Sequence, residues 1–122
     1  MSWSFSNDKP IFQQLVDIIT LKIISGEYPT GSKLDAVREL AVTAGVNPNT
    51  MQRALAEIES TGLIFTKRGD GRYVTEEKDK INAVKNAYAS GKVRAFIESV
   101  KALGLDDEEI INAVNKELRG KF

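Results

Sequence analysis

The 122-residue chain contains no cysteine and no histidine. Without cysteine, disulfide bridges and thiolate chemistry are excluded. Without histidine, the chain lacks the commonest general base and the commonest protein ligand of transition metals. It also lacks a glycine-rich loop of the kind that binds phosphate groups. An enzyme is therefore the least favoured class, and we expect no catalytic residue, cofactor or metal.

Long apolar runs are missing as well. No stretch approaches the roughly 20 apolar residues that a membrane-spanning helix needs. Residues 1–9, MSWSFSNDK, lack the basic start and the apolar core of a signal peptide. We therefore expect a cytoplasmic protein without a membrane partner. Its length fits one domain, or one small domain with an appendage.

Net charge is zero, with 17 basic and 17 acidic residues, which argues against a nucleic-acid binder. The charges are unevenly spread, however. Residues 65–74, FTKRGDGRYV, carry Lys67, Arg68 and Arg72 against Asp70 alone, whereas residues 106–109 are four consecutive acids. A zero total can therefore hide a basic edge and an acidic end.

The first 75 residues follow the order of a winged helix-turn-helix domain. A first helix is predicted over residues 10–25, and a second begins with Asp35 as its N-cap and ends before Gly45. After the tight turn VNP comes a third helix. Residues 63–74, LIFTKRGDGRYV, then predict a β-hairpin with a glycine-rich tip. The expected fold class is mainly α with a small β-hairpin.

The third helix has a polar front end that packing alone does not require. Asn47 is suited to cap it and Pro48 to its first position. At 100° per residue its apolar side consists of Met51, Ala54, Leu55 and Ile58, and its opposite side of Asn49, Arg53, Ala56 and Ser60, flanked by Gln52. Asparagine, glutamine and arginine can each form paired hydrogen bonds to base edges in a major groove. These residues therefore predict a DNA-reading helix.

Residues 76–122 predict two helices that form a dimerisation segment. One spans residues 80–103, with a possible interruption at Ser90-Gly91, and the other begins after Asp106, with Glu109 completing a capping box. Two isolated helices cannot cover a broad apolar surface by themselves. The expected dimer interface consists of Ile81, Val84, Tyr88, Phe96, Val100, Ile110, Val114 and Leu118. The alternative is that both helices simply cap the winged domain.

Residues 10–75 resemble the GntR family of bacterial transcription regulators. The stretches that carry the resemblance are PIFQQLVDII and SGEYPTGSKLDAVRELAVTAGVNPNTMQRALAEIESTGLIFTKRGDGRYV. The end of the chain, KALGLDDEEIINAV, is similar to the two-helix C-terminus of the YtrA subfamily. The resemblance therefore spans nearly the whole chain.

The resemblance implies which residues bind DNA. From the third helix these would be Asn47, Asn49, Thr50, Gln52 and Arg53; from the second, Arg38; from the wing, Lys67, Arg68, Gly69, Gly71 and Arg72. The family usually has Pro-Ser where this chain has Asp35-Ala36, so Arg38 could pair with Asp35 instead of DNA.

The leading hypothesis is a homodimeric, sequence-specific regulator of transcription. We expect a repressor at an inverted-repeat operator, and the YtrA-like resemblance implies ABC-transporter genes as targets. The sequence identifies no small-molecule effector. The alternative is a winged-helix module that binds protein and not DNA, which zero net charge supports and the basic residues of the third helix and hairpin oppose.

Overall fold

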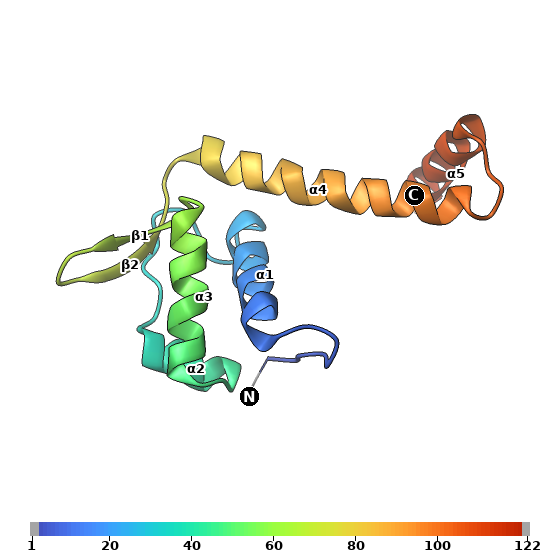
Figure 1. Ribbon diagram of the computed structural model, residues 1–122. Helices are drawn as coiled ribbons and strands as arrows, with labels where there is room; N and C mark the ends of the chain where they lie inside the picture. The colour runs from blue at the N-terminus through green and yellow to red at the C-terminus, as the bar shows by residue number, and fades with distance from the viewer. Residues whose placement is uncertain (1–2, 121–122) are drawn as a thin grey trace. The chain divides into compact units, whose positions relative to one another are not determined.

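A computed structural model of the protein describes residues 3–120 (Figure 1). Within that range the chain is mainly helical with one antiparallel hairpin, which confirms the predicted fold class. The elements are α1 (Ile11–Ile24), α2 (Val37–Ala44), α3 (Pro48–Ser60), β1 (Ile64–Lys67), β2 (Gly71–Val74), α4 (Lys78–Lys101) and α5 (Asp107–Arg119). None of the described helices has the length and apolar character that crossing a bilayer requires.

The chain forms two compact units, Met1–Val84 and Lys85–Phe122. The first contains α1 to α3, the hairpin and the first turns of α4. The second contains the remainder of α4 and α5. The unit with the winged domain therefore extends beyond the hairpin to include Ile81, a buried residue of α4.

The core of the first unit is built around α3, which contacts α1, α2 and β1. All four residues of its predicted apolar side, Met51, Ala54, Leu55 and Ile58, are buried, as expected. The other helices and the hairpin add the buried residues Leu15, Ile19, Ile23, Leu40, Leu63, Ile64 and Val74. Thr20 of α1 is also buried. The first helix is thus covered from more than one side.

Local capping fixes where α2 and α3 begin and end. The N-cap of α2 is Ala36, so the expected cap by Asp35 is wrong: the helix begins at Val37, one residue too late for that carboxylate. Gly45 closes α2 in the left-handed conformation with φ of 77°, as predicted. The side-chain oxygen of Asn47 accepts a hydrogen bond of 2.7 Å from the backbone N–H of Asn49, and Pro48 is the first residue of α3.

A segment before α2 extends the hairpin. The two strands pair in the register Ile64↔Val74, Phe65↔Tyr73, Thr66↔Arg72 and Lys67↔Gly71. Beside them, the N–H of Val74 donates to the carbonyl of Ser32 at 2.8 Å, and the N–H of Leu34 donates to the carbonyl of Arg72 at 2.9 Å. The wing is therefore bonded to the chain that leads into α2.

The residues before α1 are anchored as well. The N–H of Trp3 donates to the carbonyl of Ala44 at 3.1 Å, at the end of α2. The side-chain amide of Gln14 donates to the carbonyls of Ser6 and Lys9 and accepts from the N–H of Ser6. The sequence pattern did not predict this anchoring.

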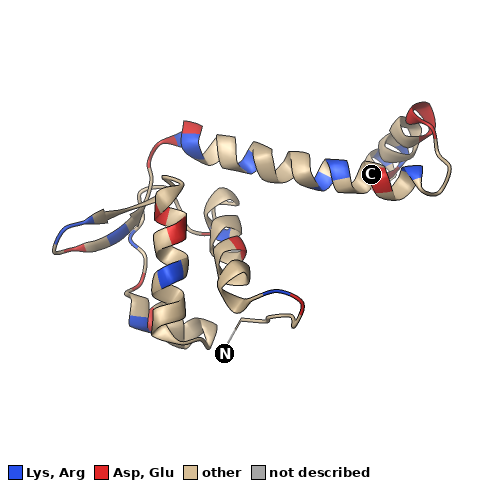
Figure 2. Cartoon of the chain, in the orientation of Figure 1, with Lys and Arg blue, Asp and Glu red and all other residues tan. Residues whose placement is uncertain are grey.

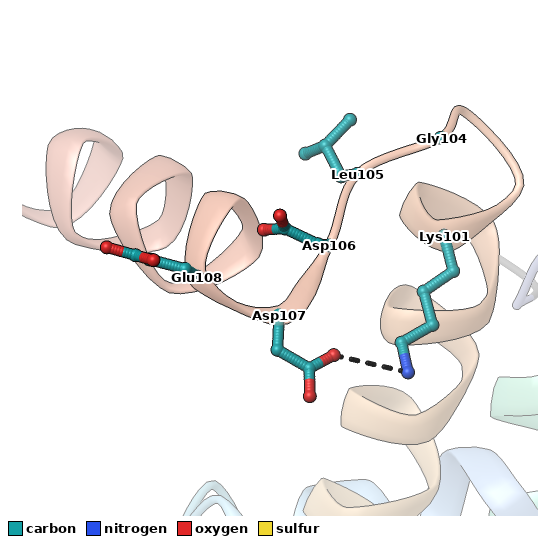
Figure 3. A pocket seen from close by; sticks show the side chains of 6 residues that line it. All are labelled: Lys101, Gly104, Leu105, Asp106, Asp107 and Glu108. Atoms are coloured by element: carbon teal, nitrogen blue, oxygen red, sulfur yellow. Dashed lines mark ion pairs between the residues drawn. The ribbon is translucent and has the colours of Figure 1, made fainter.

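In the second unit, α4 continues through Ser90-Gly91, so the possible interruption there does not occur. The predicted capping box of α5 is confirmed: Asp106 accepts from the N–H of Glu109 at 2.9 Å, and Glu109 accepts from the N–H of Asp106 at 3.0 Å. Across the turn, the ammonium of Lys101 lies 3.3 Å from a carboxylate oxygen of Asp107, beside a shallow hollow (Figure 3).

Candidate nucleic-acid interface

The polar side of α3 is open to solvent at its N-terminal end. Asn49 and Gln52 are exposed, and Thr50 is half-buried. Ala56 is also exposed, and its small side chain does not project beyond these polar residues. The acids Glu57 and Glu59 lie in that second half, so the end that begins with Asn47 is the one suited to approach a polyanion (Figure 2).

Asn47 has a structural duty in addition to any contact with DNA. Its side-chain oxygen already accepts the bond from Asn49 that caps the helix. Its amide N–H₂ group stays available as a donor. We therefore expect Asn47 to offer a donor to a phosphate and not the paired bonds that read a base.

Arg53 is held by an aromatic ring. Its guanidinium carbon lies 4.0 Å from the centre of the Phe12 ring on α1. A cation over an aromatic face is stabilised by about 0.5–1 kcal/mol at an exposed site. This contact could not be predicted from the sequence, because it joins residues from two different helices that are far apart in the chain.

The outer face of the wing combines basic and aromatic side chains. The rings of Phe65 and Tyr73 stack, with their centres 5.9 Å apart, and the ammonium of Lys67 lies 4.4 Å from the centre of the Tyr73 ring. Arg68 is exposed at the tip. Next to it, Gly69 has φ of 77° and open space where a Cβ would lie. The tip therefore offers cations and a backbone without side-chain obstruction.

Asp70, the acid of the wing tip, is fully engaged. It accepts a hydrogen bond of 2.7 Å from the hydroxyl of Tyr73, and its other oxygen lies 3.1 Å from the ammonium of Lys33. The hydrogen bond from Tyr73 is the largest of the effects that hold the pKa of Asp70 below its ordinary value, and the hydrogen bond from Lys33 is the next. Lys33 also lies close to Gly71, since a Cβ there would meet the Cε of Lys33 at 3.0 Å. Lys33 was not among the predicted site residues.

Arg72 does not point the same way as Lys67 and Arg68. Its side chain is only 20% exposed, and its Nε lies 3.5 Å from a carboxylate oxygen of Glu59 on α3. The structure therefore groups Arg72 with α3, whereas the other two cations are exposed on the wing.

Arg38 is exposed on α2. Among residues 3–120 it forms no ion pair, with Asp35 or with any other carboxylate. Its guanidinium is therefore available for a phosphate.

Comparison with known proteins places this arrangement in a family. Residues 11–74, which hold α1 to β2, match the family described as "Bacterial regulatory proteins, gntR family". The chain belongs to the GntR family. It is a DNA-binding transcriptional regulator of the winged helix-turn-helix type.

The similarity between this chain and several relatives extends beyond the winged domain. YhcF, an HTH-type transcriptional regulator of Bacillus subtilis (strain 168), is 33% identical over 120 residues, covering 98% of this chain and 99% of YhcF. YtrA, an HTH-type transcriptional repressor of the same organism, is 35% identical over 97 residues, covering 80% and 70%. A solved structure, "GntR family transcriptional regulator from Listeria monocytogenes", has 45% identity and a TM-score of 0.84, covering 92% and 98%.

Much of the apolar surface of the α4–α5 segment is exposed. Of the residues predicted at the dimer interface, Phe96, Val114 and Leu118 are exposed, and Val84, Tyr88 and Val100 are half-buried. Ile81 and Ile110 are each only 7% exposed and are therefore already covered within the chain. Three further apolar residues of this segment are exposed: Val93, Leu103 and Ile111.

Proposed function

We propose that this protein is a homodimeric repressor that binds an inverted-repeat operator and blocks transcription by occupying a promoter. The observation that carries the proposal is the polar N-terminal end of α3, where Asn49 and Gln52 are exposed in the same compact unit as the basic wing. A helix of this kind reads bases from the major groove, because amide side chains can form paired hydrogen bonds to adenine.

We assign three kinds of DNA contact. Asn49, Gln52 and Arg53 would meet base edges in the major groove. Phosphate contacts would come from Arg38, Asn47 and Thr50, which flank that group on α2 and α3. The wing would approach the minor groove through Lys67, Arg68 and the backbone at Gly69 and Gly71, of which Gly69 has open space around it.

Dimerisation would use the α4–α5 segment. Leu118, on α5, is 64% exposed. The other exposed apolar residues of this segment are Val93 and Phe96 on α4, Leu103 in the turn that follows α4, and Ile111 and Val114 on α5. Packing against a second copy would remove this surface from water, a gain of about 25 cal/mol per Å² of apolar surface. It would also raise operator affinity, since the second reading head then binds at high local concentration. The division into a winged domain over residues 1–75 and a dimerisation segment over residues 76–122 is part of this proposal.

The repressor role rests on one relative, and the target genes rest on the YtrA-like resemblance of the sequence. YtrA of Bacillus subtilis is a transcriptional repressor and matches 80% of this chain. By this likeness we propose that the protein acts in the cytoplasm and represses its target genes. The YtrA-like resemblance makes ABC-transporter operons the class of target to test first. No effector is part of the proposal.

A second candidate, a winged module that binds protein instead of DNA, is favoured by the zero net charge. Selection from random duplexes separates the two candidates. Purified protein should enrich an inverted repeat, and the enriched duplex should be retarded in a gel despite a scrambled competitor. Recovery of random sequence at 0.15 M salt would favour the second candidate.

A further inference from the structure

The hairpin turns one of its two faces toward α3. Because side chains alternate along a strand, Ile64 and Val74 share this face with Thr66 and Arg72. The first cross-strand pair is buried at the base of the wing. The second lies one step further out, where the polar side chains of Thr66 and Arg72 replace the apolar pair.

Both polar residues meet one carboxylate. The hydroxyl of Thr66 lies 3.0 Å and 3.1 Å from the two oxygens of Glu59, in the last turn of α3. The Nε of Arg72 lies 3.5 Å from one of these oxygens. That nitrogen is buried and has no hydrogen-bond acceptor, so charge attraction alone links it to Glu59.

We propose that Glu59 fixes the angle of the wing relative to α3, with Thr66 and Arg72 as positioning residues, and that Arg72 is not a phosphate contact. This inference rests on the proposed function for its consequence in DNA binding. A two-stranded hairpin is marginally stable by itself, so its direction depends on what it contacts. The carboxylate that holds it belongs to the same helix as Asn49 and Gln52. One rigid helix thereby sets the spacing between base reading and the wing.

Thr66 supplies the matched pair of variants. Thr66→Val keeps the shape and the β propensity of the residue but removes the hydroxyl, whereas Thr66→Ser keeps the hydroxyl. In the free protein, hydrogen exchange at the wing amides should become roughly tenfold faster for Thr66→Val, the effect of losing one hydrogen bond to a charged group. Exchange in Thr66→Ser should stay close to the parental rate. Equal, parental rates in both variants would overturn the proposal.

The role of Arg72 is tested at constant net charge. The double variant Glu59→Gln/Arg72→Gln removes both charges of the pair. Hydroxyl-radical footprints on the selected duplex should lose protection at the outer minor groove while protection at the α3 contacts persists. The slope of log affinity against log salt should fall by more than the value of about 0.9 that Lys67→Ala loses as one phosphate contact, because a displaced wing gives up the contacts of Lys67 and Arg68 together.

Two further outcomes are decisive. If the double variant kept the protection at the outer minor groove and reduced the salt slope only as much as Lys67→Ala does, Arg72 would be a phosphate contact and the proposal would be wrong. If the parental protein selected no DNA, the proposed function would fail. Amide exchange in the free Thr66→Val variant would even then decide whether Glu59 holds the wing.

Discussion

The guanidinium of Arg53 stacks on the ring of Phe12, 4.0 Å from its centre, so a side chain assigned to DNA reading is oriented by α1. Stacking limits the directions that the guanidinium can take and reduces the conformational entropy that a base contact would cost. We therefore expect the base preference to depend on Phe12, a residue that lies outside the helix-turn-helix.

Arg53→Ala should weaken operator binding by about 1–3 kcal/mol and relax the base preference at one position of each half-site. Phe12→Leu should produce the same relaxation with a smaller loss of affinity, about 0.5–1 kcal/mol, because only the stacking is lost. Phe12→Tyr keeps the ring and is the control. Selection sequencing of the three variants measures the preference, and an unchanged motif in Arg53→Ala would contradict the assignment.

Arg68→Ala should weaken all duplexes about equally, because a contact to phosphate carries no sequence information. The salt slope should fall by about 0.9, which fluorescence anisotropy at several salt concentrations measures. Asn82→Ala, at an exposed site on α4, is the control and should leave both values unchanged. A loss of affinity confined to the operator would instead make Arg68 a base-reading residue.

Tyr73→Phe should raise the pKa of Asp70 toward the ordinary value of 3.8, because the hydrogen bond from Tyr73 is the largest cause of its depression. A carboxyl group with a depressed pKa stabilises the fold above the unfolded value, and this contribution is lost as pH falls through the folded value. Parental wing stability should therefore decline below about pH 4, and less so in Tyr73→Phe. Carboxyl ¹³C titration measures the pKa. Asp8, whose pKa is lowered by Ser6, is the internal control.

Phe96→Asp should convert the proposed dimer to a monomer, since an unpaired carboxylate buried in an apolar interface is costly. Sedimentation velocity measures the assembly state, and operator affinity should fall with it. Asn86→Asp, an equal change of charge at an exposed polar site on α4, should leave the dimer intact. A Phe96→Asp protein that still sediments as a dimer would move the interface away from this surface.

Two reading heads related by a two-fold axis should protect two half-sites about one helical turn apart, roughly 10 bp between their centres. A footprint at nucleotide resolution on the selected duplex tests this spacing. Protection of one asymmetric site by a single protomer would contradict the proposed arrangement.

Local sequence signals predicted the elements well. Pro48 after Asn47 identified the start of α3, the Asp106–Glu109 box identified that of α5, and the glycines around Asp70 identified the hairpin tip. Each of these signals acts over a few residues, so it can be read from the chain directly. The Asp35 cap failed for the same local reason: a carboxylate one residue too early cannot reach the free N–H groups.

Contacts between distant residues could not be predicted in this way. The Phe12–Arg53 stacking, the Lys33–Asp70 ion pair and the Thr66–Glu59 hydrogen bond each depend on how separate elements pack. Arg72 shows the consequence: the resemblance implied a contact with DNA, whereas the alternation along β2 turns its side chain toward α3.

Trp3, whose N–H donates to the carbonyl of Ala44, gives the protein an intrinsic fluorescent probe at the end of α2. Trp3 is the only tryptophan of the chain, and its ring lies 5.3 Å from the ammonium of Lys22. Its emission wavelength and its quenching by iodide therefore report on one event, the release of the N-terminal segment from the end of α2. That end leads directly into the turn before α3, so unlabelled protein mixed with operator in a stopped-flow fluorimeter would show whether this turn rearranges during binding.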